Sequence, residues 1–307
     1  MARVTALVTA RNEPWLQQTV DDLLAHAEGD LEVVVILDGY WPDPPLRDDP
    51  RVVVLHHGES KGLRASINAG AALAHGQYLM KTDAHCAFSP GFDVALADHY
   101  EEGWVSAPTR WSLKAETWER GYGPLEYLYL TYPYTPDAQY GEGLHGKKWL
   151  GPTGLGSMRP ADYYYRERER AALKIDDIQA FQGSCWFTSK ATFEKVGGMD
   201  ESFGTFYQEP QEIAFKCWMS GGRIVVNKHA WYAHWHKSSP PGYGFTRHGK
   251  HRDMRYSTWF WMNNQWPLAT RTIEEFVAFH WPIPGWPETW QEEKVAFEAA
   301  HPVCSAS

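Results

Sequence analysis

Short apolar runs alternate with helical patterns along the first hundred residues of the chain. Four apolar runs predict buried strands, at residues 4–8, 31–37, 52–55 and 78–81. Apolar residues at helical spacing predict two helices, at residues 14–26 and 63–74. This succession is typical of a mostly parallel sheet with helical crossovers, so we predict an α/β fold.

The second half of the chain is less regular. Two segments rich in Gly and Tyr, 121–140 and 141–157, indicate long loops over the sheet. Order returns with patterns that predict strands at 180–188 and 223–227 and helices at 190–196 and 209–220. The remaining residues, 238–307, mix basic, aromatic and proline-rich pieces, and we predict an irregular aromatic and basic extension there.

Polar residues gather where the predicted strands end, at residues 9–13, 38–39, 56–62 and 82–85. Ligands of such sheets bind outside the carboxyl ends of the strands, so these clusters predict one site. Asp83 and His85 are two residues apart, which sends both side chains to the same face. A carboxylate with an imidazole suits a Mn²⁺-like ion, but the pair also fits an ordinary strand-end aspartate and a surface histidine. Asp38 ends another strand, where it can accept hydrogen bonds from a ribose or a uracil.

Several motifs resemble those of the A-fold glycosyltransferases. They are the segment Thr9-Ala10-Arg11-Asn12-Glu13, the strand 33–39 that ends in Asp-Gly, and residues 62–70. Residues 81–85, Lys-Thr-Asp-Ala-His, resemble the aspartate-x-histidine motif of the polypeptide N-acetylgalactosaminyltransferases. Segments 183–187, 196–200 and 208–222 follow in that family's order, so the likeness covers roughly residues 3–237.

The resemblance implies the glycosyltransferase-A fold, a mostly parallel sheet flanked by helices, for a catalytic domain over residues 1–237. Residues 1–103 would be its nucleotide-binding half and residues 104–237 its acceptor and sugar half. The implied donor is a nucleoside diphosphate sugar, with uridine as the expected base. The residues implied in donor binding are Thr9, Ala10, Arg11, Glu13, Asp38, Gly62, Arg64, Asn68 and Asp83.

A divalent metal, Mn²⁺ or Mg²⁺, also follows from the resemblance. Its implied ligands are Asp83, His85 and His234, and His236 is the alternative third ligand. Such an ion would neutralise the charge that develops on the departing diphosphate.

The chain departs from the family pattern in its second predicted helix. The family commonly has an arginine just before the position of Asn68, where this chain has Ile67. We therefore expect Arg64, one helical turn earlier, to reach the diphosphate. The lectin domain and membrane anchor of the animal enzymes have no counterpart in the sequence, which argues against a secretory protein acceptor.

The catalytic residues that the resemblance implies are Glu209, Glu212 and Trp186. The two glutamates are three residues apart at a helix start and share one face. Glu209 would lie near the sugar and the acceptor, with Trp186 beside it, while Glu212 would hold the donor or a neighbouring loop. Such a carboxylate is the general base of an inverting enzyme, or steadies the oxocarbenium-like transition state of a retaining one. The histidine-containing metal motif favours retention.

Charge, hydropathy and cysteine content set further limits. The net charge of −9 gives no overall attraction to polyanions, so a nucleic-acid partner would need a local basic patch. No run reaches the roughly 18 apolar residues of a membrane span. The chain starts without a signal-peptide pattern, and its four scattered cysteines suit a reducing compartment. We expect a cytoplasmic protein, in the host cytoplasm if a bacteriophage encodes it.

Basic and aromatic residues interleave around the start of the extension. The basic ones are His234, His236, Lys237, Arg247, His248, Lys250, His251, Arg252 and Arg255. This mix can follow a phosphate backbone and stack a base, form a lid over the diphosphate, or be a solvated charged face. The chain also resembles bacteriophage glycosyltransferases that decorate hydroxymethylated pyrimidines, so DNA modification is one expected function. Glycan or protein acceptors are alternatives, as is a non-catalytic carbohydrate- or nucleic-acid-binding module.

Overall fold

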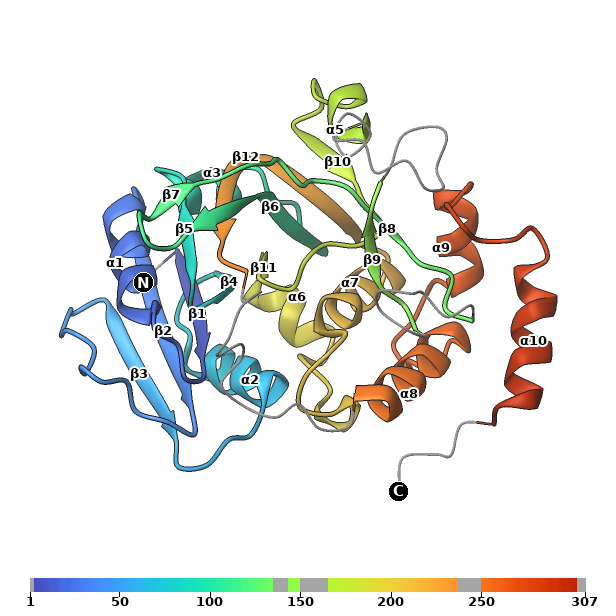
Figure 1. Ribbon diagram of the computed structural model, residues 1–307, viewed down its shortest axis with the longest axis horizontal. Helices are drawn as coiled ribbons and strands as arrows, with labels where there is room; N and C mark the ends of the chain where they lie inside the picture. The colour runs from blue at the N-terminus through green and yellow to red at the C-terminus, as the bar shows by residue number, and fades with distance from the viewer. Residues whose placement is uncertain (1–2, 135–142, 150–164, 237–249, 303–307) are drawn as a thin grey trace.

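A central sheet of ten strands organises the part of the chain that the computed structural model describes, residues 3–134, 143–149, 165–236 and 250–302 (Figure 1). Its N-terminal half consists of four parallel strands. They are β1 (Val4–Ala10), β2 (Leu31–Asp38), β3 (Val52–His57) and β4 (Tyr78–Asp83). The sheet order β3-β2-β1-β4 brings the ends of β1, β2 and β4 to one rim. The predicted α/β fold with a mostly parallel sheet is confirmed.

The second half of the sheet contains strands of both directions. β11 (Cys185–Ser189) lies antiparallel between β4 and β6 (Trp104–Lys114), and β12 (Arg223–His234) runs parallel to β6. Short partners complete it: β5 (Cys86–Phe88), β7 (Glu119–Arg120) and the edge strand β10 (Ile175–Asp177). β8 (Leu128–Leu130) and β9 (Gly146–Lys148) form a separate two-stranded sheet.

Alternating side chains of the central strands feed two cores, one on each face of the sheet. Val33 and Val35 of β2 face the core that includes α1 (Leu16–His26) and α3 (Phe92–Asp98). Val34 and Ile36 face the opposite core. The helices on that second face are α2 (Leu63–Leu73), α6 (Lys190–Lys195) and α7 (Glu209–Met219), preceded by the short helix η1 (Glu201–Phe203).

The described part of the C-terminal extension is helical, whereas the sequence predicted an irregular segment. Its helices are α8 (Lys250–Met262), α9 (Ile273–His280) and α10 (Trp290–Ala300), which gather beside α7 at the right of Figure 1. Trp261, Phe276 and Trp290 are buried in the same core as α7. The predicted division at residue 237 stays a prediction. In the described ranges no helix combines the length and the apolar character needed to cross a bilayer.

Element boundaries differ most in the second half. The predicted strand 180–188 is shorter, because the chain forms a loop up to Ser184 before β11 begins. The predicted strand 223–227 continues to His234 through an irregularity between Asn227 and Trp231. A short helix, α5 (Tyr165–Glu169), lies between the two Gly- and Tyr-rich segments and β10. Of those segments, residues 135–142 and 150–157 lie outside the described ranges.

Candidate active site

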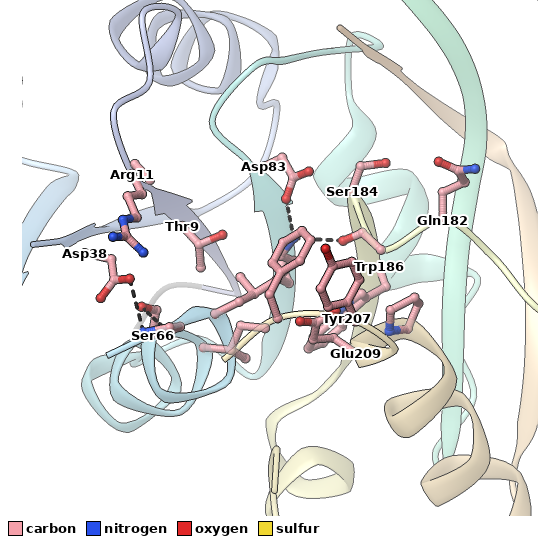
Figure 2. Close-up of a pocket in the computed structure, with 18 of the residues that line it drawn as sticks. Thr9, Arg11, Asp38, Ser66, Asp83, Gln182, Ser184, Trp186, Tyr207 and Glu209 are labelled. Carbon is pink, nitrogen blue, oxygen red and sulfur yellow. Dashed lines mark hydrogen bonds and ion pairs between the residues drawn. The ribbon is translucent and has the colours of Figure 1, made fainter. Parts of the chain in front are cut away.

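A pocket of about 370 Å³ opens at the carboxyl ends of β1, β2 and β4, against the start of α7 (Figure 2). Most of the predicted site residues line it: Thr9, Ala10, Arg11, Glu13, Asp38, Gly62, Asp83, His85, Trp186, Glu209 and His234. Three predicted residues, Arg64, Asn68 and Glu212, are not among its lining residues. The strand-end clusters therefore do form one site.

Asp83, His85 and His234 form a compact cluster at one wall of the pocket. One ligand atom from each lies within 4.8 Å of the others. The Nε2 atoms of the two histidines are 3.0 Å apart, and Oδ2 of Asp83 is 3.4 Å from Nε2 of His234. One carboxylate oxygen and two imidazole nitrogens are a donor set that suits a divalent transition-metal ion.

Neighbouring side chains hold this cluster in place. The Nδ1 atom of His85 is 3.0 Å from Oε2 of Glu13, so Glu13 fixes the ring with Nε2 facing the cluster. Lys81, which is 1% exposed, donates to Asp83 and to the carbonyl of Gly183. Burial raises the pKa of Asp83, but the charge of Lys81 and the hydrogen bond with His234 outweigh burial and lower the pKa overall. Asp83 is therefore ionised at neutral pH.

The two histidines after β12 differ in their surroundings. Burial lowers the pKa of His234 well below its usual range, so the ring is neutral and can offer a lone pair. Burial and the charge of Arg110 lower the pKa of His236 to about 4, and its Nε2 contacts Nη2 of Arg110. His234 points its Nε2 at Asp83 and His85, which favours it over His236 as the third ligand.

Asp38 organises the loop at the other end of the pocket. Its carboxylate accepts hydrogen bonds from the Ser60 hydroxyl at 2.6 Å and from the backbone N–H groups of Lys61 and Gly62. Burial raises the pKa of Asp38, but these hydrogen bonds prevail and lower it. Gly62 has a φ of +93°, and an added Cβ would lie 2.8 Å from Cα of Thr205. Only glycine fits this turn without strain.

Glu209 and Glu212 have separate environments despite their spacing. Glu209 lines the pocket at the first residue of α7, and its Oε1 has no hydrogen-bond partner among the described residues. Burial raises the pKa of Glu209, and the charge of Arg64, 3.7 Å away, opposes this.

Glu212 is fully buried behind the pocket. Its Oε2 accepts from Nε of Arg64 at 2.7 Å, and its Oε1 accepts from Lys216 at 2.9 Å and from the Asp200 backbone. The guanidinium of Arg64 also donates to the carbonyls of Gly204 and Tyr207. The structure thus gives Arg64 and Glu212 a role in holding the loop before α7, and does not bring Arg64 to the expected diphosphate position.

Asn68 likewise braces the wall behind the pocket. Its amide donates to the carbonyl of Met199 and accepts from the Met199 N–H, both at 2.9 Å. It fixes the segment that leads to η1.

Several lining residues were absent from the predicted site. They include Ser66, Lys81, Gln182, Ser184 and the segment 205–208. Tyr207 and Gln208 adopt left-handed backbone with φ values of 85° and 61°. Such strain in non-glycine residues is concentrated at functional sites, but no sequence pattern announces it. Lys81 could have been predicted, because it lies within a buried strand and a buried lysine requires a partner of opposite charge or a hydrogen-bond acceptor.

Sequence comparisons show similarity to known glycosyltransferases. The model of the family described as glycosyl transferase family 2 matches residues 5–197. Polypeptide N-acetylgalactosaminyltransferase 5 of Caenorhabditis elegans is 25% identical over 242 residues, 74% of this chain and 36% of that protein. Polypeptide N-acetylgalactosaminyltransferase 3 of Mus musculus is 24% identical over 253 residues, 77% of this chain and 37% of that protein. The chain spans a little over a third of the length of these curated relatives.

Solved structures share the fold. GalNAc-T7, solved with UDP, GalNAc and Mn²⁺, matches with a TM-score of 0.61 and 18% identity over 98% of this chain and 58% of that chain. The mannosyltransferase PcManGT from Pyrobaculum calidifontis, in complex with GDP-Man and Mn²⁺, matches with a TM-score of 0.52 and 15% identity over 99% of this chain and 77% of that chain. The predicted glycosyltransferase-A fold is confirmed. Because the family model covers more than half of the chain, from β1 to the end of α6, the protein belongs to glycosyl transferase family 2.

Proposed function

We propose that the protein is a metal-dependent glycosyltransferase that moves a sugar from a UDP-sugar to an acceptor hydroxyl. One observation carries the proposal: Asp83, His85 and His234 converge in a pocket that also contains Asp38 and Glu209. Family membership and two structural neighbours that were solved with Mn²⁺ support it.

The ion would be Mn²⁺ or Mg²⁺, and it would neutralise the charge that develops on the departing diphosphate. Asp83, His85 and His234 would hold it. Lys81 keeps the Asp83 carboxylate ionised and oriented, and Glu13 fixes the ring of His85. Because these contacts hold the ligand side chains in place, little reorganisation would accompany loading of the site.

The nucleoside would lie between residues 9–13 and Asp38. Figure 2 shows Thr9, Arg11 and Asp38 together at one end of the pocket, with Asp83 between them and Ser184. Uridine is the proposed base because GalNAc-T7 was solved with UDP, and guanosine is the alternative, since PcManGT was solved with GDP-Man.

Glu209 would face the sugar and the acceptor, and Trp186 would form the wall beside them. The pKa of Glu209 is raised by burial, which makes its carboxylate a stronger base than an exposed glutamate. In an inverting reaction it would take the proton of the acceptor hydroxyl, and in a retaining one it would stabilise positive charge on the sugar.

The identity of the acceptor stays a prediction. Hydroxymethylpyrimidine DNA of a bacteriophage was expected from the basic segment, but residues 237–249 lie outside the described ranges. A glycan or a protein hydroxyl is the alternative acceptor. The cytoplasmic location also stays a prediction; it is supported by free, buried thiols at Cys86, Cys185 and Cys217.

Release of UDP from a panel of UDP-sugars tests the proposal, measured with Mn²⁺, with EDTA, and with or without hydroxymethylpyrimidine DNA. We expect release that requires Mn²⁺ and falls at least about a hundredfold in His234→Ala. The control His75→Ala removes an exposed histidine that does not line the pocket and should release UDP like the wild type. Release that is indifferent to EDTA and to His234→Ala would contradict the proposal. No release from any donor would favour a non-catalytic binding module, and stimulation by DNA would support the DNA acceptor.

A further inference from the structure

Arg110 is a buried cation close to the proposed metal site. It lies in β6 opposite Tyr232 of β12, and only 7% of it is exposed. Side chains paired across neighbouring strands point to the same face of a sheet. Arg110 therefore shares a face with Tyr232 and, two residues further along β12, with His234.

Among the described residues, no carboxylate forms an ion pair with Arg110. Its Nε has no hydrogen-bond partner there, and the one side-chain hydrogen bond that Arg110 makes to a described residue is from Nη2 to Nε2 of His236. Arg110 and Glu126 both line a second, small cavity, but the Glu126 carboxylate binds Lys228 and the Thr109 hydroxyl, both at 2.9 Å. A buried charge that lacks a counter-charge is costly, and a negatively charged ligand would compensate it.

His236 connects Arg110 to the main pocket. A guanidinium can only donate hydrogen bonds, so the Nε2 that it contacts must be the acceptor nitrogen of a neutral imidazole. The proton of that ring is then on Nδ1, which has no partner among the described residues. Because His236 lines the main pocket, this N–H is a donor available to a ligand there.

Lys148 of β9 adds a second positive charge to the same region. Burial and the charge of Arg110 both lower its pKa, and Lys148 in turn acts on His236. Two positive side chains thus come together from β6 and β9, beside the neutral ring of His236.

This region lies on the far side of the metal site from the nucleotide end. In the sheet, β4 with Asp83 stands between the nucleotide strands β1 and β2 and the pair β6 and β12. Gln182 lines both the main pocket and the small cavity at Arg110, and Figure 2 shows it opposite Arg11 and Asp38. A diphosphate beside the metal would already have its counter-charge, so the cations beyond it suit a different anion.

We infer that Arg110 and His236 form an anion-binding subsite for the acceptor, which carries a phosphate or carboxylate group near the hydroxyl that receives the sugar. This inference rests on the proposed glycosyltransferase function and adds the chemical class of its acceptor. Arg110 would supply the charge and His236 the hydrogen bond that reaches the ligand.

Binding of inorganic phosphate and of acetate to the full-length protein tests the subsite by isothermal titration calorimetry, first alone and then with saturating Mn²⁺ and UDP. We expect at least one anion to bind the Mn²⁺- and UDP-loaded protein. Arg110→Met removes the positive charge beside the anion and should weaken this binding about tenfold or more. The affinity for UDP should stay within about threefold of the wild type.

The control Arg120→Met removes a cation of β7 that stacks on Trp111 and Trp231, away from both cavities. It should bind the anions like the wild type. If UDP displaces the anion, the positive region serves the donor diphosphate and the inference is wrong. It is also wrong if neither anion binds, or if Arg110→Met and Arg120→Met behave alike. Failure of the protein to bind UDP and Mn²⁺ at all would instead count against the proposed function, and the titration without them would still test the subsite.

Discussion

The hydrogen bond between Glu13 and His85 makes a sharp prediction about the metal site. Both side chains are 7% exposed, and Oε2 of Glu13 lies 3.0 Å from Nδ1 of His85. Removing a carboxylate that orients a metal-bound histidine typically costs about 10–100-fold in metal affinity, or about 1.4–2.7 kcal/mol. We expect Glu13→Ala near the upper end of this range. Glu13→Gln should fall near the lower end, because its amide oxygen can still accept from Nδ1.

The affinity for Mn²⁺ is measured from the electron paramagnetic resonance signal of the free ion during titration in the presence of UDP. The matched control is Glu32→Gln, which alters a glutamate that contacts His75 at 2.8 Å in a glutamate–histidine pair outside the pocket. It should leave the affinity unchanged. If Glu13→Ala binds Mn²⁺ as tightly as the wild type while folding normally, Glu13 does not orient a metal ligand and the reasoning fails.

Three further predictions concern the walls of the pocket. Arg64→Met leaves the Glu212 carboxylate without its arginine, so the free energy of unfolding in urea should fall by about 3–5 kcal/mol. Unchanged stability together with lost UDP affinity would instead show that Arg64 binds the diphosphate. The pKa of Asp38 is lowered, so its stabilising effect is present above about pH 4 and is lost as the pH falls through the folded-state pKa. Asp38→Asn should therefore lose less stability than the wild type between pH 6 and pH 3 in urea unfolding, and an equal loss would refute this. Gly62→Ala places a Cβ against Thr205 at a φ of +93°, so its melting temperature should fall by several degrees, and an unchanged one would show that the loop yields freely.

The N-terminal half was predictable because its hydrophobic pattern is local and uninterrupted. Each residue of β2 from Val33 to Leu37 is buried, as expected of a strand covered on both faces. β12 was predicted too short because the polar residues Lys228 and His229 interrupt its apolar pattern where the pairing with β6 shifts. Sequence periodicity does not indicate that a strand resumes after such an irregularity.

Helix α8 shows how a regular pattern can be hidden. Among residues 254–262, the buried positions are Met254, Ser257, Thr258, Trp261 and Met262, and the first four follow the i, i+3, i+4, i+7 spacing of a helix. Two of them are small polar residues, whereas the large ring of Trp259 is only half-buried. The composition therefore concealed an amphipathic helix and suggested an irregular segment.

The metal cluster was predictable because strand ends and family motifs both indicated it, but the contacts around it were not. Glu209 and Glu212 both lie in the first turn of α7, and their spacing does not show which of them faces the pocket. Arg64, which is 148 residues away from Glu212, decides that Glu212 is held behind the pocket. Arg110 gave no sequence signal either, since an arginine in a strand reveals its missing counter-charge only when its neighbours are known.

Crystals grown with Mn²⁺ and UDP, with data collected at the manganese absorption edge, test the central claim most directly. We predict one anomalous peak within about 2.0–2.4 Å of Oδ2 of Asp83 and of the Nε2 atoms of His85 and His234, with the diphosphate of UDP beside it. A peak held by His236 in place of His234, or one outside this cluster with UDP bound, would contradict the account.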